Sequence, residues 1–153
     1  MNKHLFIFTP SVWLGEGKIQ LNMVEEELPF YTKWNITQKD LDGKIECVQQ
    51  IQVKGLSEMM HNKLLFSDFA QGNFLIELDN PSIGKVTGKG LITDQMIAWE
   101  FRAAQIGFEG FEAYEKQPDD SYLMHAEYAT ADQLRTVIKG KVWQESSSKK
   151  QFS

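Results

Sequence analysis

A period-two alternation of apolar and polar residues constrains this chain more than any other feature of its sequence. It occurs in five stretches, at residues 30–37, 45–53, 73–79, 96–103 and 122–128. Successive side chains of a β-strand point to opposite faces, so this pattern is typical of strands with one buried and one exposed face. We therefore expect a chain built mainly of strands. Only residues 9–14 and 57–63 are compatible with single helical turns.

Turn-forming residues separate these stretches at regular intervals, as at Asp42-Gly43, Gln71-Gly72 and Pro118-Asp119-Asp120. About ten strands are predicted, near residues 15–23, 29–39, 43–54, 62–69, 73–79, 84–92, 95–105, 108–117, 121–130 and 133–144. No helix is expected that would serve as a crossover, so neighbouring strands must pair antiparallel. A long antiparallel meander leaves two unpaired edges unless it closes. The sequence thus predicts an all-β fold, a single antiparallel up-and-down β-barrel of about 8–10 strands.

Length and charge exclude several classes of protein. The 153 residues suit one domain, which we place at residues 1–145, with residues 146–153 as a disordered C-terminal tail. The net charge of −5 disfavours binding to nucleic acid. The only apolar run near the N-terminus, residues 5–8, is too short for a signal peptide, and no stretch is long enough for a membrane helix. We expect a cytoplasmic protein with neither nucleic-acid nor membrane partners.

The segment Trp13-Leu14-Gly15-Glu16-Gly17, followed by Pro29-Phe30-Tyr31, resembles the start of calycin barrels. It is most similar to the nitrobindin-like and fatty-acid-binding-like branch, and lipocalins carry a related tryptophan signature. The resemblance covers the N-terminal fifth by motif and the rest by its meander pattern. It implies a lipocalin-like barrel with a cavity for a small, largely apolar ligand, in which Trp13 closes one end. Nitrobindin-like proteins bind heme through a histidine near the C-terminus, which this chain lacks, so no cofactor is expected.

Large side chains of the more apolar parity are the candidate ligand-binding residues. Exposing one such side chain to water costs roughly 1.5–3 kcal/mol, so in a closed barrel that parity should face inward. The predicted lining is Trp34, Trp99, Phe101, Tyr122, Met124 and Tyr128. A bulge near Gly107 or Gly110 would invert the parity of the later strands. Arg102 is included as an anchor for an anionic ligand group, and the alternative is that it faces water.

Residues with reactive side chains give weak signals. His125 and Glu127 lie on the same face of one strand. Three interpretations are open: a proton-transfer pair, a pair of metal ligands, or a pair that faces solvent. Cys47, the only cysteine, shares a parity with Ile45 and Ile51 and is interpreted as a buried apolar residue. No catalytic motif is recognisable and no catalytic or metal-binding residue is assigned.

Three functions remain open from the sequence. The first is non-catalytic binding of a small apolar or amphipathic molecule inside the barrel. The second is a barrel enzyme, or a lyase or chaperone that handles a tetrapyrrole, with polar groups drawn from Arg102, Tyr114, His125 and Glu127. The third is a filled barrel that acts as a protein-interaction module. Homodimerisation is left open.

Overall fold

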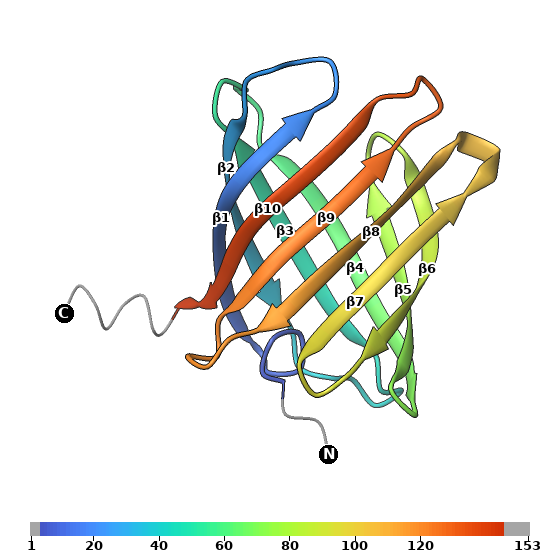
Figure 1. Ribbon diagram of the computed structural model, residues 1–153. Helices are drawn as coiled ribbons and strands as arrows, with labels where there is room; N and C mark the ends of the chain where they lie inside the picture. Colours follow the sequence, from blue (N-terminus) through green and yellow to red (C-terminus); the bar gives the residue numbers. More distant parts are fainter. Residues whose placement is uncertain (1–3, 146–153) are drawn as a thin grey trace.

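The computed structural model describes residues 4–145 and shows a closed barrel of ten antiparallel strands (Figure 1). The strands are β1 (Ser11–Leu21), β2 (Leu28–Ile36), β3 (Ile45–Val53), β4 (Met60–Ala70), β5 (Asn73–Asn80), β6 (Gly84–Ile92), β7 (Met96–Ala103), β8 (Phe108–Lys116), β9 (Tyr122–Ala129) and β10 (Arg135–Gln144). One 3-10 helix, η1 (Ala104–Ile106), joins β7 to β8. Each strand pairs with its sequence neighbours, and β1 pairs with β10 to close the ring.

The predicted all-β up-and-down barrel is therefore confirmed. The predicted disordered tail, 146–153, lies outside the described residues. Within the described part of the chain, no helix has the length and apolar character needed to cross a membrane.

The predicted inward parity is also confirmed. Trp34, Trp99, Phe101, Tyr122 and Met124 expose no more than 8% of their surface each. The sixth predicted lining residue, Tyr128, is half-buried and has the same inward parity on β9 as Met124. Parity survives the β7–β8 connection because η1 forms a tight turn and the two strands pair without a register shift.

Two local expectations are wrong. Residues 9–14 and 57–63 form no helical turn; β1 begins at Ser11 and β4 at Met60. The early start of β1 follows from its two partners, since Trp13 lies opposite Trp34 of β2 and opposite Gln144 of β10. Pairing on both sides outweighs the local preference of such a short segment.

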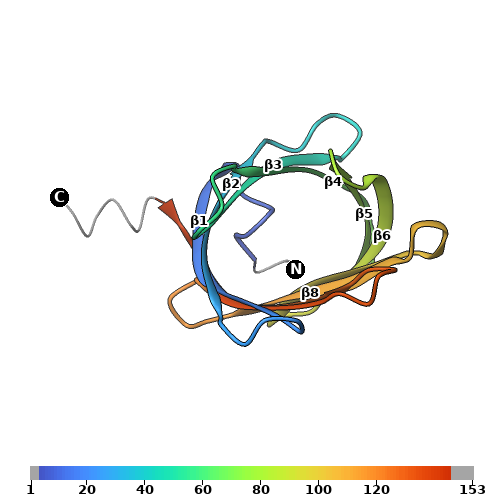
Figure 2. The ribbon, with the colours of Figure 1, turned by 90° about the horizontal axis from the view of Figure 1, so that it is seen from above.

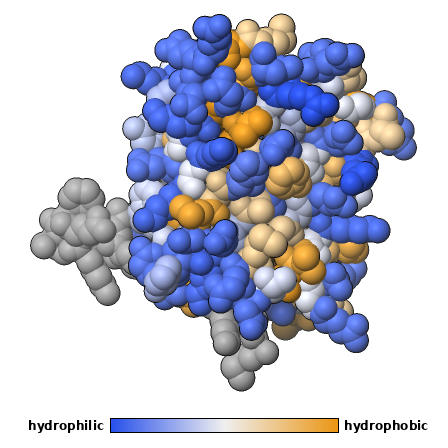
Figure 3. All heavy atoms as spheres, viewed as in Figure 1, coloured by the Kyte–Doolittle hydropathy of each residue, from blue (hydrophilic) through white to orange (hydrophobic). Residues whose placement is uncertain are grey.

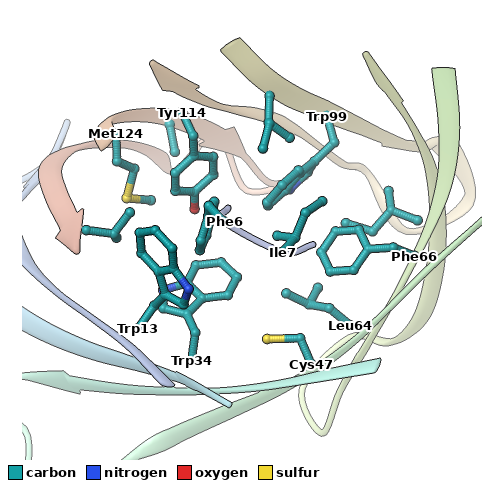
Figure 4. Packing of buried hydrophobic residues seen from close by; sticks show 14 of the residues in the cluster. Phe6, Ile7, Trp13, Trp34, Cys47, Leu64, Phe66, Trp99, Tyr114 and Met124 are labelled. Carbon is teal, nitrogen blue, oxygen red and sulfur yellow. The ribbon is translucent and has the colours of Figure 1, made fainter. Parts of the chain in front are cut away.

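The chain before β1 fills one end of the barrel. Figure 2 looks down the barrel and shows this segment inside the ring of strands, and Figure 1 shows it at the lower end. We call residues 4–8 the N-terminal plug. Phe6 and Ile7 are fully buried, and the ring of Phe6 lies 5.1 Å from Trp13, 5.2 Å from Trp34 and 5.0 Å from Tyr114 between ring centres (Figure 4).

A buried histidine attaches the plug to the barrel wall. Nδ1 of His4 lies 2.7 Å from the hydroxyl of Tyr122, and Nε2 lies 2.6 Å from the carbonyl oxygen of Thr93. A carbonyl oxygen only accepts hydrogen bonds, so Nε2 of His4 carries the hydrogen and donates the hydrogen bond to the carbonyl oxygen of Thr93. The plug is thus held by packing and by directional hydrogen bonds.

Candidate functional site

An aromatic layer crosses the middle of the barrel above the plug. It consists of Trp34, Trp99 and Tyr114, whose ring centres lie 6.4 Å (Trp34–Trp99), 5.9 Å (Trp34–Tyr114) and 5.0 Å (Trp99–Tyr114) apart. Phe6 of the plug packs against Trp34 and Tyr114. Figure 4 shows these rings around Phe6, with Met124 beside Tyr114. The plug and this layer together form a closed floor.

Some of the inward-facing residues beyond this floor are only partly buried, whereas others, such as Phe30, Val53 and Phe101, are buried. The partly buried residues lie toward the upper end of the barrel in Figure 1, opposite the plug, and keep part of their surface exposed although strand parity points them inward. These residues are Leu21, Leu28, Ile51, Asn62, Asn80, Ala103, Phe108, Glu112, Tyr128 and Ile138. The inner side chains are therefore less completely covered toward this end than around the plug. We call this region the open half.

A carboxyl group stands in the open half. Glu112 lies on β8 with the same parity as Phe108 and the fully buried Tyr114, so it faces the interior. The hydroxyl of Tyr114 donates a hydrogen bond of 2.5 Å to Oε1 of Glu112. The hydroxyl of Tyr128 donates to Oε2. Each carboxyl oxygen is thus held by a different tyrosine.

A glycine makes room for one of these tyrosines. Gly110 lies opposite Tyr128 in the β8–β9 ladder. A Cβ atom at Gly110 would lie 2.2 Å from Cδ1 of Tyr128, well inside van der Waals contact. Only glycine allows the Tyr128 ring to lie over β8 and reach Glu112.

The surroundings shift the ionisation of the whole cluster. Burial raises the pKa of Glu112, and hydrogen bonds from Tyr114 and Tyr128 offset part of that rise. Burial, followed by the nearby charge of Glu112, raises the pKa of Tyr114 and Tyr128 well above the ordinary value. Both tyrosines therefore remain protonated donors at neutral pH.

The indole N–H of Trp99 also faces this carboxyl group. This N–H helps to stabilise the charged form of Glu112. The indole nitrogen is nevertheless buried and makes no hydrogen bond of ordinary geometry. The Trp99 N–H is thus near the carboxyl group but has no hydrogen-bond partner. An unpartnered buried donor is unusual in a folded protein.

A chain of hydrogen-bonded polar side chains lines another part of the inner wall. Nδ2 of Asn80 donates to Asn62 (2.6 Å), Nδ2 of Asn62 donates to Gln49 (3.0 Å), and Nε2 of Gln49 donates to Thr32 (3.3 Å). These residues come from four neighbouring strands, β2 to β5. Gln49 lies opposite Trp34 in the β2–β3 ladder, so this amide chain borders the same aromatic layer as Glu112.

The structure separates the residues predicted to bind a ligand. Trp34 and Trp99 belong to the aromatic layer, and Tyr128 lies in the open half. Tyr122 packs at the lower end against Phe6, with ring centres 5.4 Å apart. The prediction that the tryptophans and tyrosines face inward is confirmed, whereas their role in ligand binding stays a prediction.

Arg102 does not face the interior. It alternates with the buried Phe101, so its side chain lies on the outside, where Nη2 is 3.6 Å from Oε2 of Glu100. With Arg135 it borders a cleft of about 590 Å³ at the rim between the β7–β8 and β9–β10 turns. The anchor prediction for Arg102 inside the barrel is therefore wrong, and the water-facing alternative holds.

The other reactive residues lie outside the open half or are inert. Nε2 of His125 is 2.9 Å from Glu127 on the outer face, and the His125 ring stacks on the partly exposed Phe111. Polar side chains surround the apolar ones on this face (Figure 3). Cys47 is fully buried, and burial raises its thiol pKa. Among residues 4–145, no three His, Cys, Asp or Glu side chains are grouped as metal ligands.

Sequence reasoning missed Glu112 and the amide chain. In β8 the apolar Phe111 faces outward and Glu112 inward, against the simple polarity rule. The signal that was available is the parity that Glu112 shares with Phe108 and Tyr114.

Comparison with known proteins supports the fold. No known protein family matches this sequence, and no curated protein does. Among solved structures, the S-type phycobiliprotein lyase CPES from Guillardia theta is similar, with a TM-score of 0.68 and 8% sequence identity over 89% of this chain and 88% of that chain. At this identity the likeness shows the fold alone. The chain is thus a ten-strand antiparallel barrel similar in structure to that lyase, and the resemblance to calycin barrels, including the nitrobindin-like or fatty-acid-binding-like branch, stays a prediction.

Proposed function

We propose that the protein binds a small, flat, amphipathic molecule in the open half of the barrel. The observation that carries this proposal is the ring of inward-facing, partly exposed side chains above the aromatic layer. Apolar residues such as Leu28, Ile51 and Ile138 supply a wall that gains from losing its contact with water. The buried rings of Trp99 and Tyr114 bound this region from below, and polar groups on two sides supply orientation.

The structural likeness favours one ligand class over others. The similar solved barrel is a phycobiliprotein lyase, and a lyase or chaperone that handles a tetrapyrrole is one of the functions left open by the sequence. A linear tetrapyrrole is therefore the first ligand class to test. Tetrapyrrole handling by a lyase or chaperone is the second candidate function, because it uses the same open half.

Titration with two probes tests the proposal. Biliverdin represents the linear tetrapyrroles, and 9-anthracenemethanol represents a flat neutral molecule. We expect saturable binding of one molecule per chain, measured by the absorbance band of biliverdin and the fluorescence anisotropy of the anthracene. If only 9-anthracenemethanol binds, the proposed ligand-binding function stands and a linear tetrapyrrole is excluded as the ligand.

Two neighbouring residues of β10 distinguish the interior from the outer surface. Ile138 faces the open half, whereas Val137 borders an outer groove of about 360 Å³. Ile138→Trp should weaken binding at least about tenfold by filling the open half, and Val137→Trp should leave it unchanged. The proposal is contradicted if neither probe shows saturable binding. It is also contradicted if only Val137→Trp, and not Ile138→Trp, weakens binding.

A further inference from the structure

We propose that Glu112 is the recognition point for a positively charged nitrogen of the ligand, one that carries at least one N–H. This inference rests on the proposed function, since it requires a ligand in the open half. It names the ligand group that Glu112 recognises: a protonated nitrogen of a flat ring system rather than a carboxylate.

The carboxyl group is held in a fixed position with capacity to spare. Tyr114 donates to one oxygen of Glu112 and Tyr128 to the other. A carboxylate accepts about four hydrogen bonds, two at each oxygen, so one site on each oxygen remains for another donor. Glu112 keeps part of its surface exposed, and the proposal has a ligand in the open half contact it there.

Among residues 4–145, no positively charged side chain forms an ion pair with Glu112. Strand parity places no lysine or arginine among the inward-facing residues of the open half in the described strands. The ion pairs among the described residues lie elsewhere, as at Arg102–Glu100 and Lys63–Glu46. Buried charges in proteins are ordinarily paired, because an unpaired one is costly. A ligand that brings a positive charge supplies the missing partner.

The hydrogen-bond donors around Glu112 stabilise the deprotonated, charged form of its carboxyl group. Both tyrosines point their hydroxyl hydrogens at the carboxyl oxygens, and the buried N–H of Trp99 faces the same group without a partner. A ligand carboxylate placed here would face a like charge. A ligand N–H would meet an acceptor, and its ring system would lie next to Trp99 and Tyr114, where a cation also gains from aromatic faces.

Three tricyclic probes of one shape test the charge preference at pH 7. They are 9-aminoacridine, which is cationic and carries N–H groups, neutral 9-anthracenemethanol, and anionic anthracene-9-carboxylate. Wild-type protein should bind the cation at least about tenfold more tightly than the anion, as expected for a hydrogen bond to a charged group. This preference needs no variant, so it remains measurable if a variant fails to fold.

Two matched substitutions locate the effect. Glu112→Gln keeps the shape and removes the charge; it should weaken 9-aminoacridine at least about tenfold and change 9-anthracenemethanol less than about twofold. Glu127→Gln makes the same change on the outer face of β9 and should alter neither. Wild-type affinity for the cation in Glu112→Gln overturns the inference, and so does an equal loss of the cationic and neutral probes. If the neutral probe binds without any preference for the cation, only this inference fails. If none of the three binds, the proposed function fails as well.

Discussion

Removal of the Phe6 side chain tests whether the N-terminal plug is part of the folded core. Phe6 is fully buried, and its ring contacts Trp13, Trp34, Tyr114 and Tyr122 at 5.0–5.4 Å between ring centres. Truncation of a buried phenylalanine to alanine costs about 3–5 kcal/mol, because apolar burial is lost and a cavity remains. For a domain of this size, each kcal/mol lowers Tm by about 2–4 °C. We therefore expect Phe6→Ala to lower Tm by roughly 6–20 °C.

Urea unfolding followed by tryptophan fluorescence measures this change directly. The midpoint should fall with little change in the slope, because the strands that unfold are the same. Phe8→Ala is the matched control, since Phe8 is only partly buried and its ring contacts Phe69 at the lower rim; a smaller loss is expected there. A loss below about 1 kcal/mol for Phe6→Ala would refute the reasoning, because the segment would then not fill the barrel in solution.

Three further predictions concern the interior. Burial raises the pKa of Glu112 above its ordinary value, so the folded state binds the Glu112 proton more tightly than the unfolded state, and this contribution to stability is present at low pH and lost as the pH rises through the folded-state pKa; Glu112→Gln should therefore gain in Tm relative to the wild type as the pH is raised from 4, and a constant difference would contradict this. Gly110→Ala should lower stability by about 1–3 kcal/mol in urea unfolding, because the new methyl group collides with the Tyr128 ring; an effect below about 0.5 kcal/mol would show that the ring moves freely. Cys47, buried and with a raised thiol pKa, should react with iodoacetamide only in denaturant, and rapid labelling of the native protein, detected by mass spectrometry, would contradict its placement.

The strands and their faces were predictable because alternation is a local property of the chain. Trp99 and Phe101 share a parity in one short stretch, so both the strand and its buried face follow from the sequence. Arg102 lies between two residues of that parity, so the same rule places it outside. The anchor interpretation required a polar interior at β7, and Phe101 excludes it, since only 1% of its surface is exposed.

The plug and the carboxyl cluster were not predictable by the same reasoning. Residues 5–8 show a short apolar run, and nothing local indicates that it enters the barrel; that depends on the space that ten strands leave inside. Glu112 and Tyr128 are separated by a strand turn, and their contact depends on the β8–β9 register and on the absence of a side chain at Gly110. Non-local contacts of this kind appear only once the barrel closes.

The plug and the carboxyl cluster are connected through one residue. The ring of Tyr114 packs against Phe6 on the plug side of the aromatic layer, and its hydroxyl binds Glu112 on the open side. A fully buried ring has little freedom to rotate while it is packed between Phe6, Trp34 and Trp99. The direction of its hydroxyl, and with it one oxygen of Glu112, is therefore fixed by the packing below. By filling the lower end, the N-terminal plug sets the floor of the open half and also holds the group that we propose recognises the ligand.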